Sequence, residues 1–173
     1  MDGNVITVER TIPASPEAIF SLLSDAARHP EIDGSGTVKQ ARTADSTRLR
    51  MGSNFGMAMQ MGFKYSMANT VIAYQENRRI AWQTRAPGVA GLVVGGRIWR
   101  YELEPVAAGT RVRESWDVSR DHQRLLLKLG GLPARTEGNM TRTLERLERI
   151  LVTPGKGDPV LRRVRPHGGP RAS

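Results

Sequence analysis

The stretch from Phe55 to Met67, FGMAMQMGFKYSM, alternates between large apolar or aromatic side chains at odd positions and small or polar ones at even positions. Successive side chains of a β-strand point to opposite faces, so this alternation predicts a sheet with one buried face. A hairpin turn is expected near residues 60–62, which places Met61 at the turn. Any fold for this chain must therefore cover one side of a β-hairpin.

Further segments have the same strand-like character, and most are separated by short turns such as QENRR and APG. They alternate with period two or are rich in β-branched and aromatic residues, and they bring the expected number of strands to about seven. Besides the hairpin, these segments are residues 4–12, 37–44, 68–75, 78–85, 96–105 and 110–118. Strands joined by short turns predict an antiparallel meander.

Helical patterns follow the first strand. Ser15 is a suitable N-cap and Pro16 suits the first helical position, ahead of an apolar side within residues 19–23. Residues 26–36 predict a second, shorter helix or turn that ends in glycines. Two short helices are therefore expected between the first and second strands.

The strongest helical pattern is the amphipathic segment 133–152. Its apolar stripe consists of Met140, Leu144, Leu147, Ile150 and Leu151, and charged residues cover the remaining surface. This helix is the only large apolar partner for the buried face of the sheet. The expected class is therefore α+β, with the long C-terminal helix packed against a curved sheet.

The chain has 173 residues, contains no cysteine and carries a formal net charge of +9. This length predicts one domain with a substantial core, and the absence of cysteine excludes disulfides, thiol nucleophiles and cysteine-ligated metals. The sequence shows neither a signal-peptide pattern nor an apolar run of the roughly 20 residues that span a bilayer. We therefore expect a cytoplasmic protein without a transmembrane segment.

The last part of the sequence, residues 153–173, is rich in proline, glycine and arginine and lacks periodicity. It holds five basic residues and one acid, whereas the basic residues of the remaining chain are spread among acids. We expect a single domain over residues 1–152, followed by a basic disordered tail. Such a tail is typically a solubilising end, so the charge does not predict a specific nucleic-acid partner.

The order of these elements resembles the helix-grip fold of the START-like (SRPBCC) superfamily, in particular its bacterial polyketide cyclase/dehydrase-like branch. The resemblance rests on ASPEAIFSLLSD, HPEIDGSGTVKQAR, RRIAWQT, RIWRYELEPVAAGTRVRESW and NMTRTLERLERIL, and it covers roughly residues 4–152. It implies a curved sheet wrapped around the long helix, with a deep cavity between the two. Related chains include aromatase/cyclases, lipid and sterol carriers and hormone receptors, so the fold does not settle the function.

The buried face of the sheet and the facing side of the helix are expected to supply the wall of that cavity. Methionine is unbranched and polarizable, so it suits an adaptable pocket, although it also fills gaps in a packed core. The candidate ligand-binding residues are Phe55, Met57, Met59, Phe63, Tyr65, Met67, Asn69, Trp82, Trp99, Trp116, Met140 and Leu144. Asn69 is an expected polar spot in this otherwise apolar wall.

Glu114 is the most informative polar residue, because it shares strand parity with Val112 and Trp116. If that side faces the interior, burial raises the pKa of the carboxyl and favours a role as general acid, general base or ligand anchor. The alternative is a structural carboxyl bonded to a neighbouring side chain. Tyr101, on the adjacent expected strand, donates either to a ligand carbonyl or within the core. Glu114 and Tyr101 are the two candidate catalytic residues.

His29 lies near Glu31 and Asp33, and a histidine beside carboxylates can shuttle protons. Spacings of two place these side chains on different sides of a helix, so we expect a surface histidine and no metal site. The motifs GxSxG, HExxH and GxxxxGK are absent from the sequence, and no cofactor is expected. The segment GVAGLVVGG is either a mobile apolar lid at the cavity mouth or a plain connection between strands.

Two functions fit these observations, and a third, binding of nucleic acid or an anionic membrane, rests only on the net charge and the basic tail. The first is binding of a small, largely hydrophobic molecule of the polyketide, lipid or isoprenoid type. The second is a polyketide cyclase/dehydratase-like enzyme that uses polar groups of the cavity to move protons. In either case the expected partner is a small hydrophobic molecule, and the expected protein is a monomer or homodimer.

Overall fold

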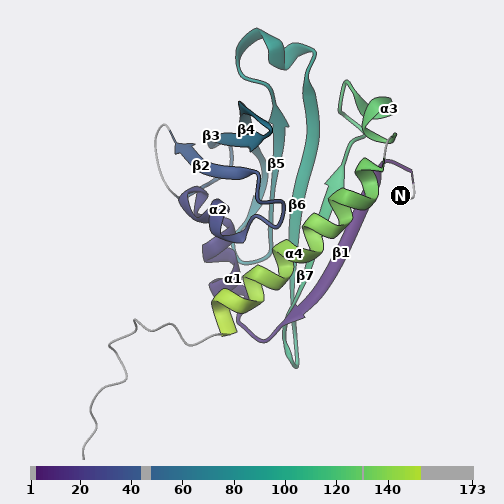
Figure 1. Cartoon of the computed structure of the whole chain (residues 1–173). Helices are drawn as coiled ribbons and strands as arrows, with labels where there is room; N and C mark the ends of the chain where they lie inside the picture. The colour runs from purple at the N-terminus through teal and green to yellow at the C-terminus, as the bar shows by residue number, and fades with distance from the viewer. Residues whose placement is uncertain (1–2, 44–47, 130, 153–173) are drawn as a thin grey trace, which may run out of the picture.

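The computed structural model describes residues 3–43, 48–129 and 131–152, so the expected tail lies outside the described residues. One antiparallel sheet of seven strands, in the order β1-β7-β6-β5-β4-β3-β2, curves around a long C-terminal helix, α4 (Leu132–Val152) (Figure 1). Short helices follow the first strand. This is the helix-grip arrangement that the sequence predicted.

The strands are β1 (Val5–Ile12), β2 (Val38–Thr43), β3 (Asn54–Met61), β4 (Phe63–Gln75), β5 (Arg79–Arg85), β6 (Gly95–Val106) and β7 (Gly109–Asp117). The remaining helices are α1 (Pro16–Leu23), η1 (Ala26–Arg28), α2 (His29–Ile32), η2 (Gly88–Leu92) and α3 (Arg124–Leu127). Strands β2 to β6 each pair with the next strand in sequence, and β7 also pairs with β1. No helix within the described residues is long and apolar enough to cross a bilayer.

The β3–β4 hairpin confirms the alternation read from the sequence. Its register pairs Met57 with Met67 and Met59 with Tyr65, so the odd-numbered residues of both strands share one face. Gly62 makes the turn with a φ of 78°, a conformation that a glycine adopts without steric cost. The prediction that Phe63 belongs to the buried face is wrong, because its side chain is 67% exposed beside this turn.

Helix α1 begins where the sequence predicted. The Ser15 hydroxyl accepts a hydrogen bond of 3.3 Å from the Ala18 amide, which satisfies one of the free N–H groups of the first turn. The apolar side of the helix is fully buried, and the Phe20 ring meets Tyr74 of β4 edge-on at 5.3 Å between centroids. The helix is therefore anchored on the inner, concave face of the sheet.

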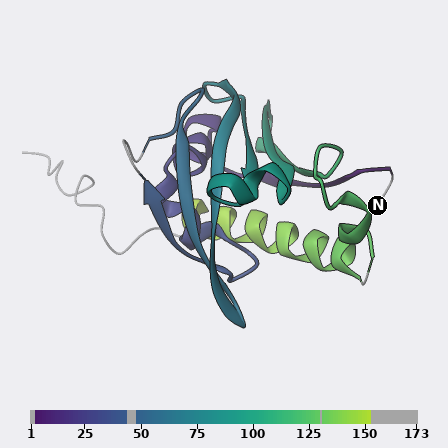
Figure 2. The same ribbon diagram turned by 90° about the horizontal axis from the view of Figure 1, so that it is seen from above.

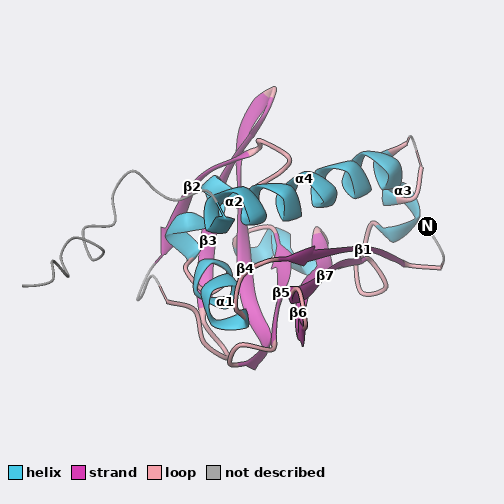
Figure 3. Ribbon diagram, turned by 90° about the horizontal axis from the view of Figure 1, so that it is seen from below, coloured by secondary structure: helices cyan, strands magenta, loops and turns pink. Residues whose placement is uncertain are grey.

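Helix α4 lies along the inner face, in contact with β1 and β7, while α1 and α2 lie beside its C-terminal half (Figures 2 and 3). The loop after α2 is tied directly to it. The Gly34 amide donates to Thr143 Oγ1 at 3.0 Å, Arg142 Nε donates to the Gly34 carbonyl at 3.0 Å, and Arg146 donates to the Asp33 carbonyl. The helix and this loop therefore close one side of the interior together.

Candidate functional site

The inner face of the sheet carries one buried carboxyl–phenol pair. Tyr101 of β6 and Glu114 of β7 are directly opposite each other in the strand register. The Tyr101 hydroxyl donates to Glu114 Oε1 at 2.8 Å, and Glu114 is only 1% exposed. The second oxygen, Oε2, is buried and has no hydrogen-bond partner within the described residues. A buried polar atom without a partner costs about 1–3 kcal/mol, so this oxygen is a point at which a ligand can bind favourably.

The surroundings of Glu114 favour its neutral form. Burial raises the pKa of its carboxyl to about 8; the hydrogen bond from Tyr101 opposes that rise, and the negative charge of Asp33 adds to it. The pKa of Tyr101 is raised well above its usual value, first by burial and then by the neighbouring Glu114. Near neutral pH, Glu114 is therefore mainly protonated, with Oε1 accepting from Tyr101 and Oε2 carrying the proton.

Tyr101→Phe is expected to raise the pKa of Glu114 further, because the phenol is the donor that favours the carboxylate. The carboxyl carbon resonance of Glu114, followed by NMR between pH 5 and 10, measures this shift. A lower pKa in the variant would mean that Tyr101 acts on Glu114 chiefly by excluding water.

Aromatic rings surround this pair on the side of α2. The Trp82 ring lies 5.6 Å from that of Tyr101 and 5.8 Å from that of Phe55, between centroids. His29 stacks on Trp82 at 5.2 Å, and one of its ring nitrogens, Nε2, hydrogen-bonds to the Leu23 carbonyl at 2.9 Å. The site therefore consists of a neutral carboxyl within a largely aromatic interior.

The expectation that His29 lies on the surface is wrong, since it is only 4% exposed. Burial lowers the pKa of its imidazole, which keeps the ring neutral against Trp82. The signal was present in the sequence: His29 and Ile32 are three residues apart, which places both on one helix face, and Ile32 is also buried. Sequence reasoning also missed that the charge of Asp33 acts on Glu114.

The predicted ligand-binding residues divide into two packed clusters. Phe55, Met57 and Trp82 pack with Leu144 of α4 in the first, which also contains the candidate catalytic residue Tyr101, and Trp116 and Met140 belong to the second. Trp99 is partly buried and packs against both. Side chains of sheet and helix meet directly here, so the interior is closed in this conformation. Phe55 and Met57 are packed against their neighbours in this conformation, and their role in lining a ligand site stays a prediction.

The other predicted wall residues lie nearer the rim. Met59, Tyr65 and Met67 are half-buried, and Met59 packs against the edge of the first cluster. Asn69 is buried on the inner face as expected, but its amide is already occupied. Its Oδ1 accepts from the Thr84 hydroxyl at 2.7 Å and its Nδ2 donates to the Phe55 carbonyl at 3.3 Å. Asn69 therefore joins three strands, and among the described residues the buried side-chain atom without a hydrogen-bond partner is Glu114 Oε2.

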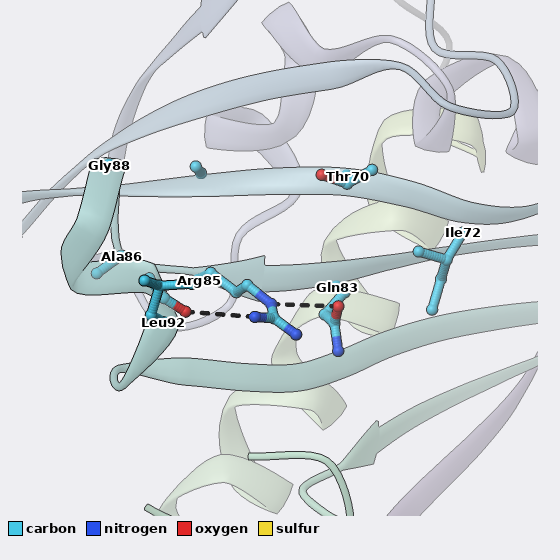
Figure 4. Close-up of a pocket in the computed structure, with 9 residues that line it drawn as sticks. Thr70, Ile72, Gln83, Arg85, Ala86, Gly88 and Leu92 are labelled. Atoms are coloured by element: carbon cyan, nitrogen blue, oxygen red, sulfur yellow. Dashed lines mark hydrogen bonds between the residues drawn. The ribbon is translucent and has the colours of Figure 1, made fainter. Parts of the chain in front are cut away.

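An open pocket of about 330 Å³ lies outside this interior, on the opposite face of the sheet (Figure 4). Helix η2 and the neighbouring Ala86 form one wall, and outward-facing side chains of β4 and β5, including Thr70 and Gln83, form the other. Arg85 crosses it, donating to Gln83 Oε1 and to the Gly91 carbonyl at 3.3 Å each. The GVAGLVVGG segment thus borders an outer-face pocket, which does not fit the predicted lid over the inner one.

Comparison with known proteins adds family information to this geometry. A family model described as "Polyketide cyclase / dehydrase and lipid transport" matches residues 5–152. The protein Rv0088 of Mycobacterium tuberculosis (strain ATCC 25618 / H37Rv) is 32% identical over 113 residues, which make up 64% of this chain and 45% of that protein. The matched part of the chain thus spans less than half the length of this curated relative.

Solved structures share the architecture at low sequence identity. The major latex-like protein 151 of Panax ginseng superposes with a TM-score of 0.65 at 11% identity, covering 86% of this chain and 97% of that one. DynU16, from the dynemicin biosynthetic locus, gives a TM-score of 0.63 at 16% identity and covers 87% of this chain and 48% of that one. These likenesses concern the fold, whereas the family model matches the sequence of nearly the whole described chain. The chain belongs to the polyketide cyclase/dehydrase and lipid transport family.

Proposed function

We propose that this chain binds a small, largely apolar molecule between the inner face of the sheet and α4. The observation that carries the proposal is the buried Glu114 Oε2, which lacks a hydrogen-bond partner within the described residues. When protonated, Oε2 is a hydrogen-bond donor, so the ligand it favours carries an acceptor, such as the carbonyl of a polyketide, a lipid ester or an isoprenoid quinone. Apolar burial at roughly 25 cal/mol per Å² supplies most of the affinity, and this hydrogen bond fixes the orientation.

The closed interior must open to admit such a molecule. Met57 and Met59 have unbranched side chains with three rotatable bonds, so they change shape at lower cost than the rings beside them. The three tryptophans of the chain, Trp82, Trp99 and Trp116, belong to the clusters of this interior. Any ligand that enters is therefore expected to change the intrinsic tryptophan fluorescence.

A matched pair of probes tests the proposal. Fluorenone and fluorene have the same tricyclic frame, but only fluorenone carries a carbonyl. At pH 6.5 we expect fluorenone to bind about three- to tenfold more tightly, the value of one net hydrogen bond. Quenching of tryptophan fluorescence measures both affinities. If neither probe nor a panel of longer polycyclic ketones changes the fluorescence, the proposed function is contradicted.

Two variants locate the preference at Glu114. Glu114→Met removes the donor and is expected to abolish the preference for fluorenone. Glu114→Gln keeps an N–H donor and is expected to retain the preference at every pH, whereas the wild type loses it above pH 8 as its carboxyl ionises. If the wild type and both variants preferred fluorenone over fluorene equally, the carbonyl of fluorenone would not be bound by Glu114.

The alternative function is a cyclase/dehydratase-like enzyme, and the 2.8 Å contact between Tyr101 and Glu114 favours it. A carboxyl with a pKa of about 8 donates and accepts protons near neutral pH, which suits general acid–base catalysis on a folded polyketide. Glu114→Gln separates the two functions. A carrier retains binding in this variant, whereas an enzyme that depends on the carboxyl proton retains binding and loses turnover.

A further inference from the structure

One end of the molecule exposes a group of large apolar side chains that the interior site does not explain. They belong to two segments far apart in the sequence, η2 with the residue after it, and α3 with the turn that follows. Their exposed fractions lie between 65% and 85%, and the residues are Val89, Leu92, Val93, Leu125, Leu126 and Leu129. Burial of Leu127, which lies between the exposed leucines, fixes α3 to the core and keeps its neighbours facing outward.

The two segments lie at the same end of the sheet. Strand β6 begins just after η2 and β7 ends shortly before α3, and these strands pair antiparallel with Ile98 opposite Asp117. The His122 amide donates to the Gly95 carbonyl at 3.1 Å, which joins the two connections. In Figure 1 both segments lie at the top of the molecule, with α3 beside the N-terminal end of α4 and η2 at the tip of the connection between β5 and β6.

This end is also cationic. Arg120 and Arg124 are exposed and Lys128 is half-exposed, and none of the three forms an ion pair within the described residues. The one acid between residues 118 and 136, Asp121, is buried, and its Oδ2 accepts from Arg97 Nε at 3.0 Å. The exposed leucines of α3 and the turn after it thus lie among three basic side chains that form no ion pair within the described residues. We call this surface, with its six apolar residues and these three basic ones, the apolar–basic end.

We propose that the apolar–basic end docks on an anionic lipid bilayer. Exposed leucine and valine side chains enter the boundary between headgroups and acyl chains, while flanking Arg and Lys side chains meet the negative surface. A second copy of the chain would bring the same basic charges together, and residues 153–173 are themselves basic. Charge complementarity therefore favours an anionic surface over either of these occupants. The inference does not depend on which molecule the interior binds.

The test is sedimentation of the full chain with vesicles containing equal amounts of phosphatidylglycerol and phosphatidylcholine, compared with vesicles of phosphatidylcholine alone. We expect binding to the anionic vesicles that weakens as salt is raised. Leu125→Ser/Leu126→Ser is expected to lower the partition coefficient at least about tenfold, because two apolar side chains are lost from the interface. Arg124→Gln/Lys128→Gln is expected to lower it about thirtyfold, since each basic residue near such a surface contributes about fivefold.

Matched controls come from other parts of the surface. Met51→Ser removes an apolar side chain that is 64% exposed outside the apolar–basic end. Arg78→Gln/Arg79→Gln removes two exposed cations at the β4–β5 turn, the end of β5 opposite η2. Both controls are expected to bind within about twofold of the wild type. Circular dichroism checks that each variant is folded.

Three results would overturn the proposal. The first is binding that the leucine and arginine–lysine variants retain in full. The second is binding that only deletion of residues 154–173 removes, which would assign it to that segment. The third is a wild type that does not bind vesicles but forms a concentration-dependent dimer, which Leu125→Ser/Leu126→Ser dissociates. That result would make this end a contact between two copies.

Discussion

Glu114→Gln is expected to have a higher free energy of unfolding than the wild type at about pH 8.5 and a similar one at about pH 5. The folded carboxyl has a pKa of about 8, against 4.5 for an ordinary glutamate. Between these values the folded state holds a proton that the unfolded chain releases. Each pH unit in this window therefore lowers the free energy of unfolding of the wild type by up to about 1.4 kcal/mol.

The sign follows from the direction of that pKa shift. The contribution of the Glu114 proton to the free energy of unfolding is fully present below pH 4.5 and is lost as pH rises from there through about 8. Above that pH the folded protein must bury a charged carboxylate. Glutamine keeps the shape of the protonated carboxyl and does not ionise. The variant is thus expected to exceed the wild type by several kcal/mol above pH 8, on the order of 3–5, as measured by urea unfolding at fixed pH.

His29 imposes the opposite dependence and must be separated from this effect. Burial lowers the pKa of its imidazole, so stability falls as pH drops below 6.5 and the unfolded chain takes up a proton. Because both proteins keep His29, its contribution cancels in their difference. Glu137→Gln, on an exposed position of α4, controls for the substitution itself. A difference between Glu114→Gln and the wild type that is constant with pH would show that Glu114 is not protonated in the folded protein.

The sequence predicted the fold because its signals are local and repeated. Alternation through β3 and β4, the Ser15–Pro16 helix start and the apolar stripe of α4 each point to one element, and the order of elements leaves few ways to bury them. The burial of Phe63 was predicted wrongly, because alternation defines a face of the sheet but does not say how far the facing helix covers that face. Beyond the edge of that cover, an apolar side chain of correct parity is exposed.

The site was predictable only in part, for a related reason. Parity placed Glu114 and Tyr101 on the inner face, but their hydrogen bond depends on the register between β6 and β7, which follows from the pairing of whole strands. The burial of His29 depends on where α2 docks, and helix docking is a tertiary property. The unpartnered Oε2 depends on every neighbour at once. Such an atom is visible only after the chain is folded.

Gly34→Ala is expected to destabilise the protein by about 3 kcal/mol or more. A methyl group on Gly34 would lie 2.1 Å from the Asn139 carbonyl oxygen and 2.5 Å from the Thr143 amide nitrogen of α4. Both are backbone atoms of a regular helix and cannot rotate away, so the loop must move outward. The hydrogen bond from the Gly34 amide to Thr143 Oγ1 and that from Arg142 to the Gly34 carbonyl are then strained or lost. A fall of about 10 °C in Tm measures the effect.

Gly138→Ala is the matched control, because it makes the same substitution within α4, at the residue before Asn139. Its added methyl group would meet only the end of the Arg142 side chain, at 3.6 Å, and alanine favours a helix over glycine by about 1 kcal/mol. Gly138→Ala is therefore expected to stabilise, and Gly34→Ala to destabilise. Equal effects of the two would show that the loop is not packed on α4.

The Gly34 contact also bears on ligand entry, because Asp33 and His29 flank the same short segment. Moving the loop outward carries the Asp33 charge away from Glu114 and loosens the cover over Trp82. Since that charge raises the pKa of Glu114, Gly34→Ala is expected to lower this pKa. It should also quicken the quenching of tryptophan fluorescence by fluorenone in stopped-flow mixing. A faster entry with an unchanged equilibrium preference for the ketone would identify the loop as the barrier to entry and Glu114 as the source of selectivity.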